Sequence, residues 1–131
     1  MREILFRGKS KSINKGKWIY GSFIEDTDLN ACCIRDKSLV YELVDRETVG
    51  QYTGLTDKNG KKIFEGDVVE FTDEYTQQKG RAEIIFEAFK WKYSGCYYGG
   101  NPIVWLCIDD ESIEFEVIGN IHDNPELLEI D

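Results

Sequence analysis

Apolar and polar residues alternate with a period of two along much of this chain, which predicts β-strands more often than helices. In residues 113–117, isoleucine, phenylalanine and valine at the odd positions alternate with glutamates at 114 and 116. Such a strand packs one face on a core and turns the other to water, as in antiparallel sheets. The same period at residues 17–21 predicts an early hairpin, because the turn-like segment 13–16 precedes it. Apolar runs at 39–43 and 102–108 indicate further strands.

The turn chemistry is clearest in residues 48–71, TVGQYTGLTDKNGKKIFEGDVVEF. Residues 57–60 end in Asn-Gly, a pair that tolerates the positive φ angles of tight hairpin turns, so the chain is expected to reverse there. Gly66 then allows a bend, and a strand follows it. The strand period puts the next side chains on opposite faces, with Val69 and Phe71 on one and Val68 and Glu70 on the other.

Other local signals mark loops and short caps. Residues 72–80 are polar enough to form a hairpin loop, and the apolar residues at 81–93 fall in two phases that a bulge joins. Residues 94–101, SGCYYGGN, predict a glycine-rich turn. Asp45 is placed to cap a short helical turn at 46–48.

Three separated segments carry a resemblance to a known family. They are REILFRGKS with GKWIYGSF near the start, the 48–71 stretch in the middle, and VIGNIHDNPELL at residues 117–128. In this order they resemble the YopX family, which is found largely in bacteriophages and prophages. The resemblance implies a mostly β fold with an SH3-like barrel in the C-terminal part, and it implies self-association. The family's biochemical activity is unassigned, so the resemblance supplies no catalytic residues.

We therefore expect a single YopX-like domain over residues 1–131, with an N-terminal β/α portion at 1–47 and an SH3-like barrel portion at 48–131. The expected fold class is α+β and predominantly β, with antiparallel strands. Asn124 and Pro125 fit the N-cap and first position of a short C-terminal helix. A chain of 131 residues can bury roughly two-thirds of its unfolded surface, enough to fold without disulfides or metal.

No stretch of the chain approaches the ~20 apolar residues that a membrane helix needs. The N-terminal residues also carry charges where a signal peptide is apolar. We expect no membrane association and a location in the cytoplasm of a bacterial host, since the family resemblance implies a phage or prophage origin.

The charge balance argues against ordinary binding to nucleic acid. The chain has 16 Lys and Arg against 25 Asp and Glu, a net charge of -9, whereas phosphate binding depends on cationic side chains. A basic N-terminal cluster leaves a nucleic-acid-associated phage accessory protein as the alternative function: Arg2, Arg7, Lys9, Lys11, Lys15 and Lys17. An acidic run that imitates DNA toward a basic host protein is a further alternative: Asp109, Asp110, Glu111, Glu114 and Glu116. Solvated surface charge explains both runs without a ligand.

No metal or cofactor is expected. The four cysteines, Cys32, Cys33, Cys96 and Cys107, lack the paired spacing of zinc ligands, and a reducing cytoplasm keeps them as free thiols. His122 is the only histidine, so two-histidine metal sites are excluded. A Cys-His nucleophile pair with Cys96 or Cys107 is an alternative to a histidine in a surface turn, which is the simpler interpretation.

Paired carboxylates are the other candidate chemistry. Glu65 and Asp67 lie two apart, so they can point to the same side of an extended chain. Asp73 or Glu74 can approach them across a loop to build a divalent-ion or hydrolytic site. A bend stabilised by Asp67 explains the same residues without catalysis, and we expect no enzyme activity.

Aromatic residues make up 13% of the chain, more than a core of this size needs. Four of them border the glycine-rich turn and form the candidate interface: Trp91, Tyr93, Tyr97 and Tyr98. Rigid aromatic side chains are enriched in protein interfaces, although β-core packing also uses them. We therefore predict a non-catalytic interaction module that forms a homo-oligomer, with a host or phage protein as a further candidate partner.

Overall fold

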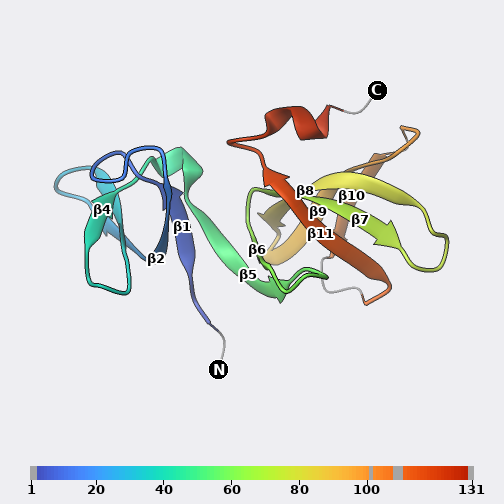
Figure 1. Cartoon of the computed structure of the whole chain (residues 1–131), viewed down its shortest axis with the longest axis horizontal. Helices are drawn as coiled ribbons and strands as arrows, with labels where there is room; N and C mark the ends of the chain where they lie inside the picture. The colour runs from blue at the N-terminus through green and yellow to red at the C-terminus, as the bar shows by residue number, and fades with distance from the viewer. Residues whose placement is uncertain (1–2, 101, 108–110, 130–131) are drawn as a thin grey trace. The chain divides into compact units, whose positions relative to one another are not determined.

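The computed structural model describes residues 3–100, 102–107 and 111–129, and Figure 1 shows the strands with labels where there is room. The chain forms two compact units, Met1–Gly54 and Leu55–Asp131. The elements of the first unit are β1 (Phe6–Lys9), β2 (Trp18–Asp26), β3 (Ala31–Arg35), β4 (Tyr41–Leu43), the 3-10 helix η1 (Arg46–Thr48) and the start of β5 (Gly50–Thr56). Those of the second unit are β6 (Lys62–Phe64), β7 (Asp67–Asp73), β8 (Lys79–Glu87), β9 (Lys90–Tyr97), β10 (Pro102–Cys107), β11 (Ile113–Asn120) and the 3-10 helix η2 (Pro125–Leu128).

The division between the units falls inside β5. The first residues of β5 pair with β1, where Gly50 lies opposite Arg7. The sequence placed the boundary between the N-terminal and barrel portions earlier, between residues 47 and 48. The pairing of β5 with β1 joins distant parts of the chain, which local patterns do not reveal, and the division at residue 47 stays a prediction. Folding as one domain over residues 1–131 stays a prediction.

In the first unit the strands form an antiparallel sheet in the order β4-β3-β2-β1-β5. β1 and β2 confirm the expected early hairpin, with Lys9 opposite Trp18. Alternate residues of β3, Cys32 and Ile34, are buried with Val44 in a small core. The residues that pack against this core are Phe6, Ile19, Phe23 and Val49.

The helical turn predicted after Asp45 is confirmed as η1. The Asp45 carboxylate accepts a hydrogen bond from Glu47 N at 3.2 Å, and Asp45 O accepts one from Thr48 N at 2.9 Å. Because the first N–H groups of a helix have no partner within it, this cap satisfies donors that would otherwise stay unpaired.

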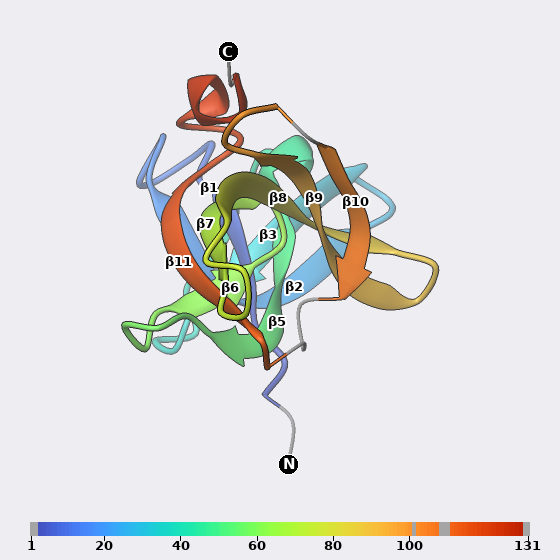
Figure 2. The same cartoon turned by 90° about the vertical axis from the view of Figure 1, so that its right-hand side faces the viewer.

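The second unit is a five-stranded antiparallel sheet in the order β10-β9-β8-β7-β11 (Figure 2). Its core follows the alternation predicted for β7, since Val69 and Phe71 are fully buried and pack with Ile84, Tyr93 and Phe115. Apolar burial contributes roughly 25 cal/mol per Å², so this cluster is the main source of the unit's stability.

The reversal predicted at residues 57–60 is confirmed between β5 and β6. Gly60 has a φ of 81°, and its N–H donates to Asp57 O at 3.0 Å. Gly66, with a φ of 89°, provides the expected bend before β7. Glycine adopts these positive angles without the steric cost of a Cβ atom, which is why both turns were legible in the sequence.

A hairpin takes the place of the bulge expected within residues 81–93. β8 and β9 pair in register as far as Glu87 opposite Lys90, so Ala88 and Phe89 form a two-residue turn. Both residues have positive φ, 53° and 63°. Alanine and phenylalanine are not residues that favour such a turn, so the sequence carries no signal for it.

Two finer features expected of the fold are not confirmed by the structure. Among the described residues the second sheet is open, with β10 and β11 as its edges, and no closed barrel forms. The expected C-terminal helix is a single 3-10 turn, η2, and Asn124 makes no side-chain cap hydrogen bond to it. A segment this short closes i→i+3 hydrogen bonds and lacks the length of a stable α-helix. The described fold is therefore predominantly β, and no described helix has the length and apolar character to cross a membrane.

Candidate interaction surfaces

The turn between β8 and β9 presents aromatic side chains to solvent. Phe89 is 95% exposed and Phe86 is 50% exposed. The ring of Phe86 lies 4.8 Å from the ring of Trp91, its partner across the hairpin. We call Phe86, Ala88, Phe89 and Trp91 the aromatic tip, and Figure 2 shows this gold turn projecting from the sheet. The tip is therefore an exposed apolar surface.

The four aromatic residues predicted as an interface lie in or directly after β9, on different faces of the sheet. Tyr93 is fully buried, with its ring 5.2 Å from Phe71 and 5.0 Å from Phe115. Trp91 and Tyr97 are partly buried and pack against the same core. The odd-numbered positions of β9 thus face the core.

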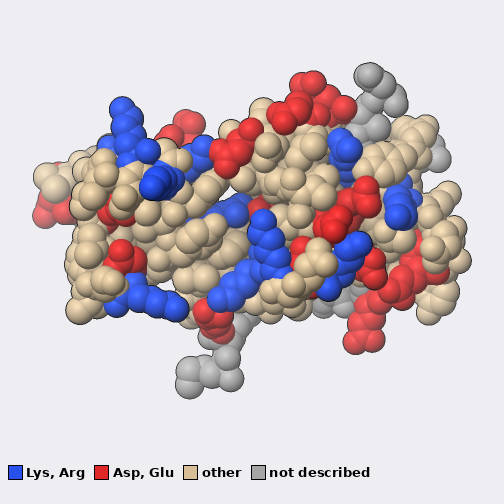
Figure 3. Space-filling view, viewed as in Figure 1, with Lys and Arg blue, Asp and Glu red and all other residues tan. Residues whose placement is uncertain are grey.

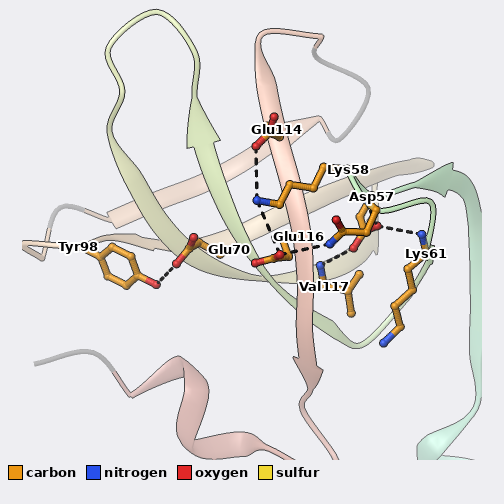
Figure 4. Close-up of polar contacts among 9 residues, drawn as sticks. Asp57, Lys58, Lys61, Glu70, Tyr98, Glu114, Glu116 and Val117 are labelled. Atoms are coloured by element: carbon orange, nitrogen blue, oxygen red, sulfur yellow. Dashed lines mark hydrogen bonds and ion pairs between the residues drawn. The ribbon is translucent and has the colours of Figure 1, made fainter.

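Tyr98 lies on the opposite face and is 42% exposed. Its hydroxyl donates to Glu70 Oε2 at 2.8 Å and accepts from Arg81 Nε at 2.9 Å, and Figure 4 shows the hydroxyl directed toward Glu70. Burial raises the pKa of the Tyr98 hydroxyl, and Glu70 raises it further, against a lowering by Arg81. The four aromatic residues therefore do not form one continuous surface, and their part in an interface stays a prediction.

The Asp57 turn is attached to the free edge of β11 (Figure 4). Asp57 Oδ1 accepts from the N–H groups of Asn59 and Lys61, each at 2.9 Å, and Asp57 Oδ2 accepts from Val117 N at 2.9 Å. Burial raises the pKa of Asp57, but the three N–H donors and the charge of Lys61 together lower it below its ordinary value of 3.8. The carboxylate thus joins the turn to the edge strand.

Beside this turn lies a hollow of about 540 Å³, which we call the acidic groove. Its apolar lining is Leu55, Ile63, Ile113 and Phe115, and its acidic lining includes Glu74, Glu111 and Glu114. Lys58 Nζ lies 3.9 Å from Glu114 Oε1 and 3.7 Å from Glu116 Oε2, and dashed lines in Figure 4 mark these two ion pairs. Exposed ion pairs of this kind contribute under about 1 kcal/mol, so little free energy is needed to separate Lys58 from these glutamates. The groove suits a segment that carries an apolar side chain beside basic ones.

The carboxylates considered as a catalytic group are divided between the two ends of β7. Asp67 is buried, and its Oδ2 accepts from Phe64 N at 2.7 Å, so it stabilises the bend before β7 as the simpler interpretation expects. Glu65 belongs to the same bend. Asp73 and Glu74 follow at the other end of the seven-residue strand, roughly 20 Å away. The structure does not bring these four carboxylates together.

Glu83 of β8 is placed unfavourably beside Glu65. Burial raises the pKa of Glu83, and the negative charge of Glu65 raises it further. The folded state therefore holds a proton more tightly than the unfolded chain. The stabilising effect of the proton on Glu83 is complete below the ordinary pKa of 4.5, and it is lost as the pH rises through the raised pKa of the folded state.

We expect Glu83→Gln to stabilise the protein by about 0.5 kcal/mol at neutral pH, a small gain because solvent screens a half-buried group. The gain should vanish below a pH of about 4, where the wild-type carboxyl is protonated. Urea unfolding at the two pH values measures it, with the exposed Glu87→Gln of the same strand as control. A loss of stability at neutral pH would show that Glu83 makes a favourable contact instead.

The cysteines behave as separate side chains. Cys32 is buried, and its thiol donates to Val44 O at 3.5 Å. Burial raises the pKa of this thiol, although Arg46 lowers it in part, so the reactive thiolate is disfavoured. Cys33 and Cys96 are also free thiols, and the side chain of Cys107 lies outside the described residues. 

His122 lies in the turn between β11 and η2, whereas Cys96 belongs to β9. The backbone N–H of His122 donates to Asn120 Oδ1 at 3.0 Å, and Asp123 N donates to the same oxygen at 2.9 Å. Asn120 therefore organises this turn. In the part of the chain that the structure describes, no three or more His, Cys, Asp and Glu residues gather as a metal site requires.

The basic run considered as a nucleic-acid surface does not lie wholly on the surface. Arg7 is only 5% exposed, and its guanidinium lies 4.5 Å from the centroid of the Trp18 ring. The exposed lysines of the β1–β2 loop are Lys11, Lys15 and Lys17, while Arg2, Asp109 and Asp110 lie outside the described residues. On the face drawn in Figure 3, basic and acidic side chains are interspersed.

Buried Glu42 is a feature that the sequence analysis missed. It is 1% exposed, and its Oε1 accepts from Ser10 Oγ at 3.0 Å, Asn14 N at 2.8 Å and Asn14 Nδ2 at 3.0 Å. These charge-assisted bonds hold the β1–β2 loop in place. The only hint in the sequence was a glutamate between two apolar residues of β4. Glu42 is the buried residue there, and its neighbours Tyr41 and Leu43 are exposed.

The described residues define a predominantly β protein of antiparallel strands whose second unit carries an aromatic tip and an acidic groove. The model of the family described as YopX protein matches residues 5–129. The chain therefore belongs to the YopX family, and the resemblance seen in its sequence is confirmed. No curated protein matches the chain.

Proposed function

We propose that this protein is a non-catalytic protein-interaction module that self-associates through the aromatic tip. The observation that supports this is the tip itself, where Ala88 and Phe89 have φ angles of 53° and 63° while Phe89 is 95% exposed. A non-glycine residue in this conformation costs roughly 1–2 kcal/mol. The tip therefore combines local strain with an aromatic side chain in water.

Neither the strain nor the exposure stabilises an isolated chain. An Asn-Gly pair adopts the same turn at little cost and places no aromatic ring in solvent. Local strain of this kind is retained mainly at functional sites. Burying one phenylalanine against a partner stabilises a complex by about 1.5–3 kcal/mol, so Phe86 and Phe89 together can drive association.

Membership of the YopX family supports the wider setting of this proposal. A phage or prophage origin would place the protein in a bacterial cytoplasm, where a host or phage protein is a second kind of partner for the tip. We also propose that the second unit is related to SH3-like barrels. The support is a sheet of five antiparallel strands around one core, in which glycines such as Gly80 and Gly95 allow close approach of neighbouring strands.

Replacing Phe89 by serine is expected to weaken self-association by about tenfold or more, because the contact loses its main apolar side chain. Leu29→Ser is the matched control, since Leu29 is 74% exposed in the turn between β2 and β3 and lies outside the tip. Sedimentation velocity over a concentration series measures the assembly of the wild type and both variants.

A second variant separates association from folding. The pair Ala88→Asn and Phe89→Gly is expected to raise the free energy of unfolding by about 1 kcal/mol, because both residues suit the turn, while self-association is lost. A wild-type chain that stays monomeric throughout the series, or an assembly that survives Phe89→Ser, would contradict the proposed function.

A further inference from the structure

We propose that the acidic groove of one copy receives the aromatic tip of a second copy. This pairing rests on the proposed function, since it names the surface against which the tip packs. Both surfaces belong to the second unit, so the pairing of its strands determines where each lies.

The groove and the tip lie at opposite ends of β8. Groove residue Ile113 is opposite Asp73 at the end of β7, and the adjoining Thr72 is opposite Lys79, the first residue of β8. The tip follows Glu87, the last of the nine residues of β8. This separation is roughly 25 Å along the strand. One copy therefore cannot fill its groove with its own tip, and the contact has to join two copies.

The groove offers the apolar contacts that the tip lacks. Leu55, Ile113 and Phe115 contribute to its lining, and Leu55 is partly exposed there. Its volume of about 540 Å³ is in the range of pockets that hold ligands, roughly 300–1,000 Å³. Inserting Phe89 removes its ring and the exposed parts of Leu55 and Ile113 from water, which is the dominant favourable contribution to association.

The charges around the two surfaces are complementary. Three glutamates line the groove, Glu74, Glu111 and Glu114, and Lys58 offsets only part of their charge. Two lysines flank the tip, Lys90 and Lys92, against the single Glu87. Opposite charges at the rim of an interface speed association and select the register in which the two surfaces meet.

Pairing of one tip with another tip satisfies these features less well. It would bring Lys90 and Lys92 of both copies together, and like charges in contact cost several kcal/mol. It would also leave the exposed part of Leu55 in the groove in contact with water. A tip in a groove is instead a head-to-tail contact, which either closes into a ring or continues as a filament.

Charge reversal on each surface tests the contact. Glu74→Lys and Lys90→Glu each bring like charges together, and each is expected to weaken self-association by about tenfold. An equimolar mixture of the two variants is expected to restore assembly to within about threefold of the wild type, because every groove then meets a tip of opposite charge. Sedimentation velocity measures the variants and the mixture. Lys15→Glu makes the same charge change at an exposed lysine of the β1–β2 loop and is the matched control.

The contact is supported if assembly returns when Glu74→Lys is mixed with Lys90→Glu, but not when Glu74→Lys is mixed with Lys15→Glu. Failure of the mixture, or a Glu74→Lys variant that assembles normally while Phe89→Ser does not, would overturn the groove as the receiving surface and leave the proposed function standing. Restoration by Lys15→Glu alone would assign the groove to the lysine loop and also overturn the inference. Assembly that survives Phe89→Ser would instead refute the proposed function.

Discussion

Replacing Gly95 of β9 by alanine is expected to lower the free energy of unfolding of the second unit by roughly 3 kcal/mol. Gly95 lies opposite Ala82 of β8, and a Cβ atom on Gly95 would meet the carbonyl oxygen of Arg81 and lie 2.6 Å from Ala82 Cα. Backbone atoms of a packed sheet cannot move aside without loss of ladder hydrogen bonds. The substitution therefore separates β8 from β9 next to the core residue Tyr93.

Urea unfolding, together with amide hydrogen exchange of peptides from β8 and β9, measures this effect. Ser94→Ala is the matched control, because it changes the adjacent residue on the opposite face of the strand and is expected to shift stability by less than about 0.5 kcal/mol. Equal unfolding midpoints for Gly95→Ala and the wild type would mean that the two strands are farther apart than described.

Replacing Asp57 by alanine is expected to destabilise the second unit by about 3 kcal/mol. The side chain accepts hydrogen bonds from Asn59, Lys61 and Val117, and its removal breaks three partly buried hydrogen bonds to a charged acceptor. Detachment of the turn also frees the outer edge of β11. Hydrogen exchange should therefore increase first at residues 57–61 and 115–117, and thermal unfolding gives the overall loss.

The pH dependence of the stability difference between the wild type and Asp57→Ala follows from the lowered pKa of Asp57. As the pH falls, the Asp57 carboxylate takes up a proton in the unfolded chain before it does so in the folded state. The stabilisation by ionised Asp57 is therefore complete above the ordinary pKa of 3.8. It is lost as the pH falls through the lower pKa of the folded state. The stability gap between the wild type and Asp57→Ala should narrow in that range. Asp73→Ala is the control, since Asp73 caps an exposed turn through Tyr75 N at 2.9 Å. A gap that does not depend on pH would contradict the ionised role of Asp57.

The position of Asp57 in a turn could be predicted, but its role in holding β11 could not. The Asn-Gly pair at 59–60 signals the turn because glycine accepts the positive φ that the backbone requires there. Val117, which donates to Asp57, is sixty residues away in the chain. Nothing in the periodicity of either segment specifies that they meet, because period-two patterns define faces and not neighbours.

At the aromatic tip, in contrast, the turn itself could not be predicted from the sequence. Hydrophobic patterning found both halves of residues 81–93 but joined them by a bulge, because Ala88 and Phe89 lack any turn propensity. Once the turn is placed between them, the register puts Trp91 and Tyr93 toward the core and leaves Phe89 in solvent. The four residues predicted as an interface therefore lie in or directly after β9, and Phe89, the most exposed aromatic residue of this hairpin, was not among those chosen.

The amino-acid sequence alone specified the antiparallel strands, the reversal at residues 57–60, the Asp45 cap and membership of the YopX family. These features depend on backbone preferences and side-chain bonds within a few residues, so local reading reaches them. Folding in three dimensions set the order of the strands, the open edges of the second sheet, the burial of Glu42 and the pairing of the Asp57 turn with β11. Those outcomes join distant segments, and their register is chosen by the packing of the whole core.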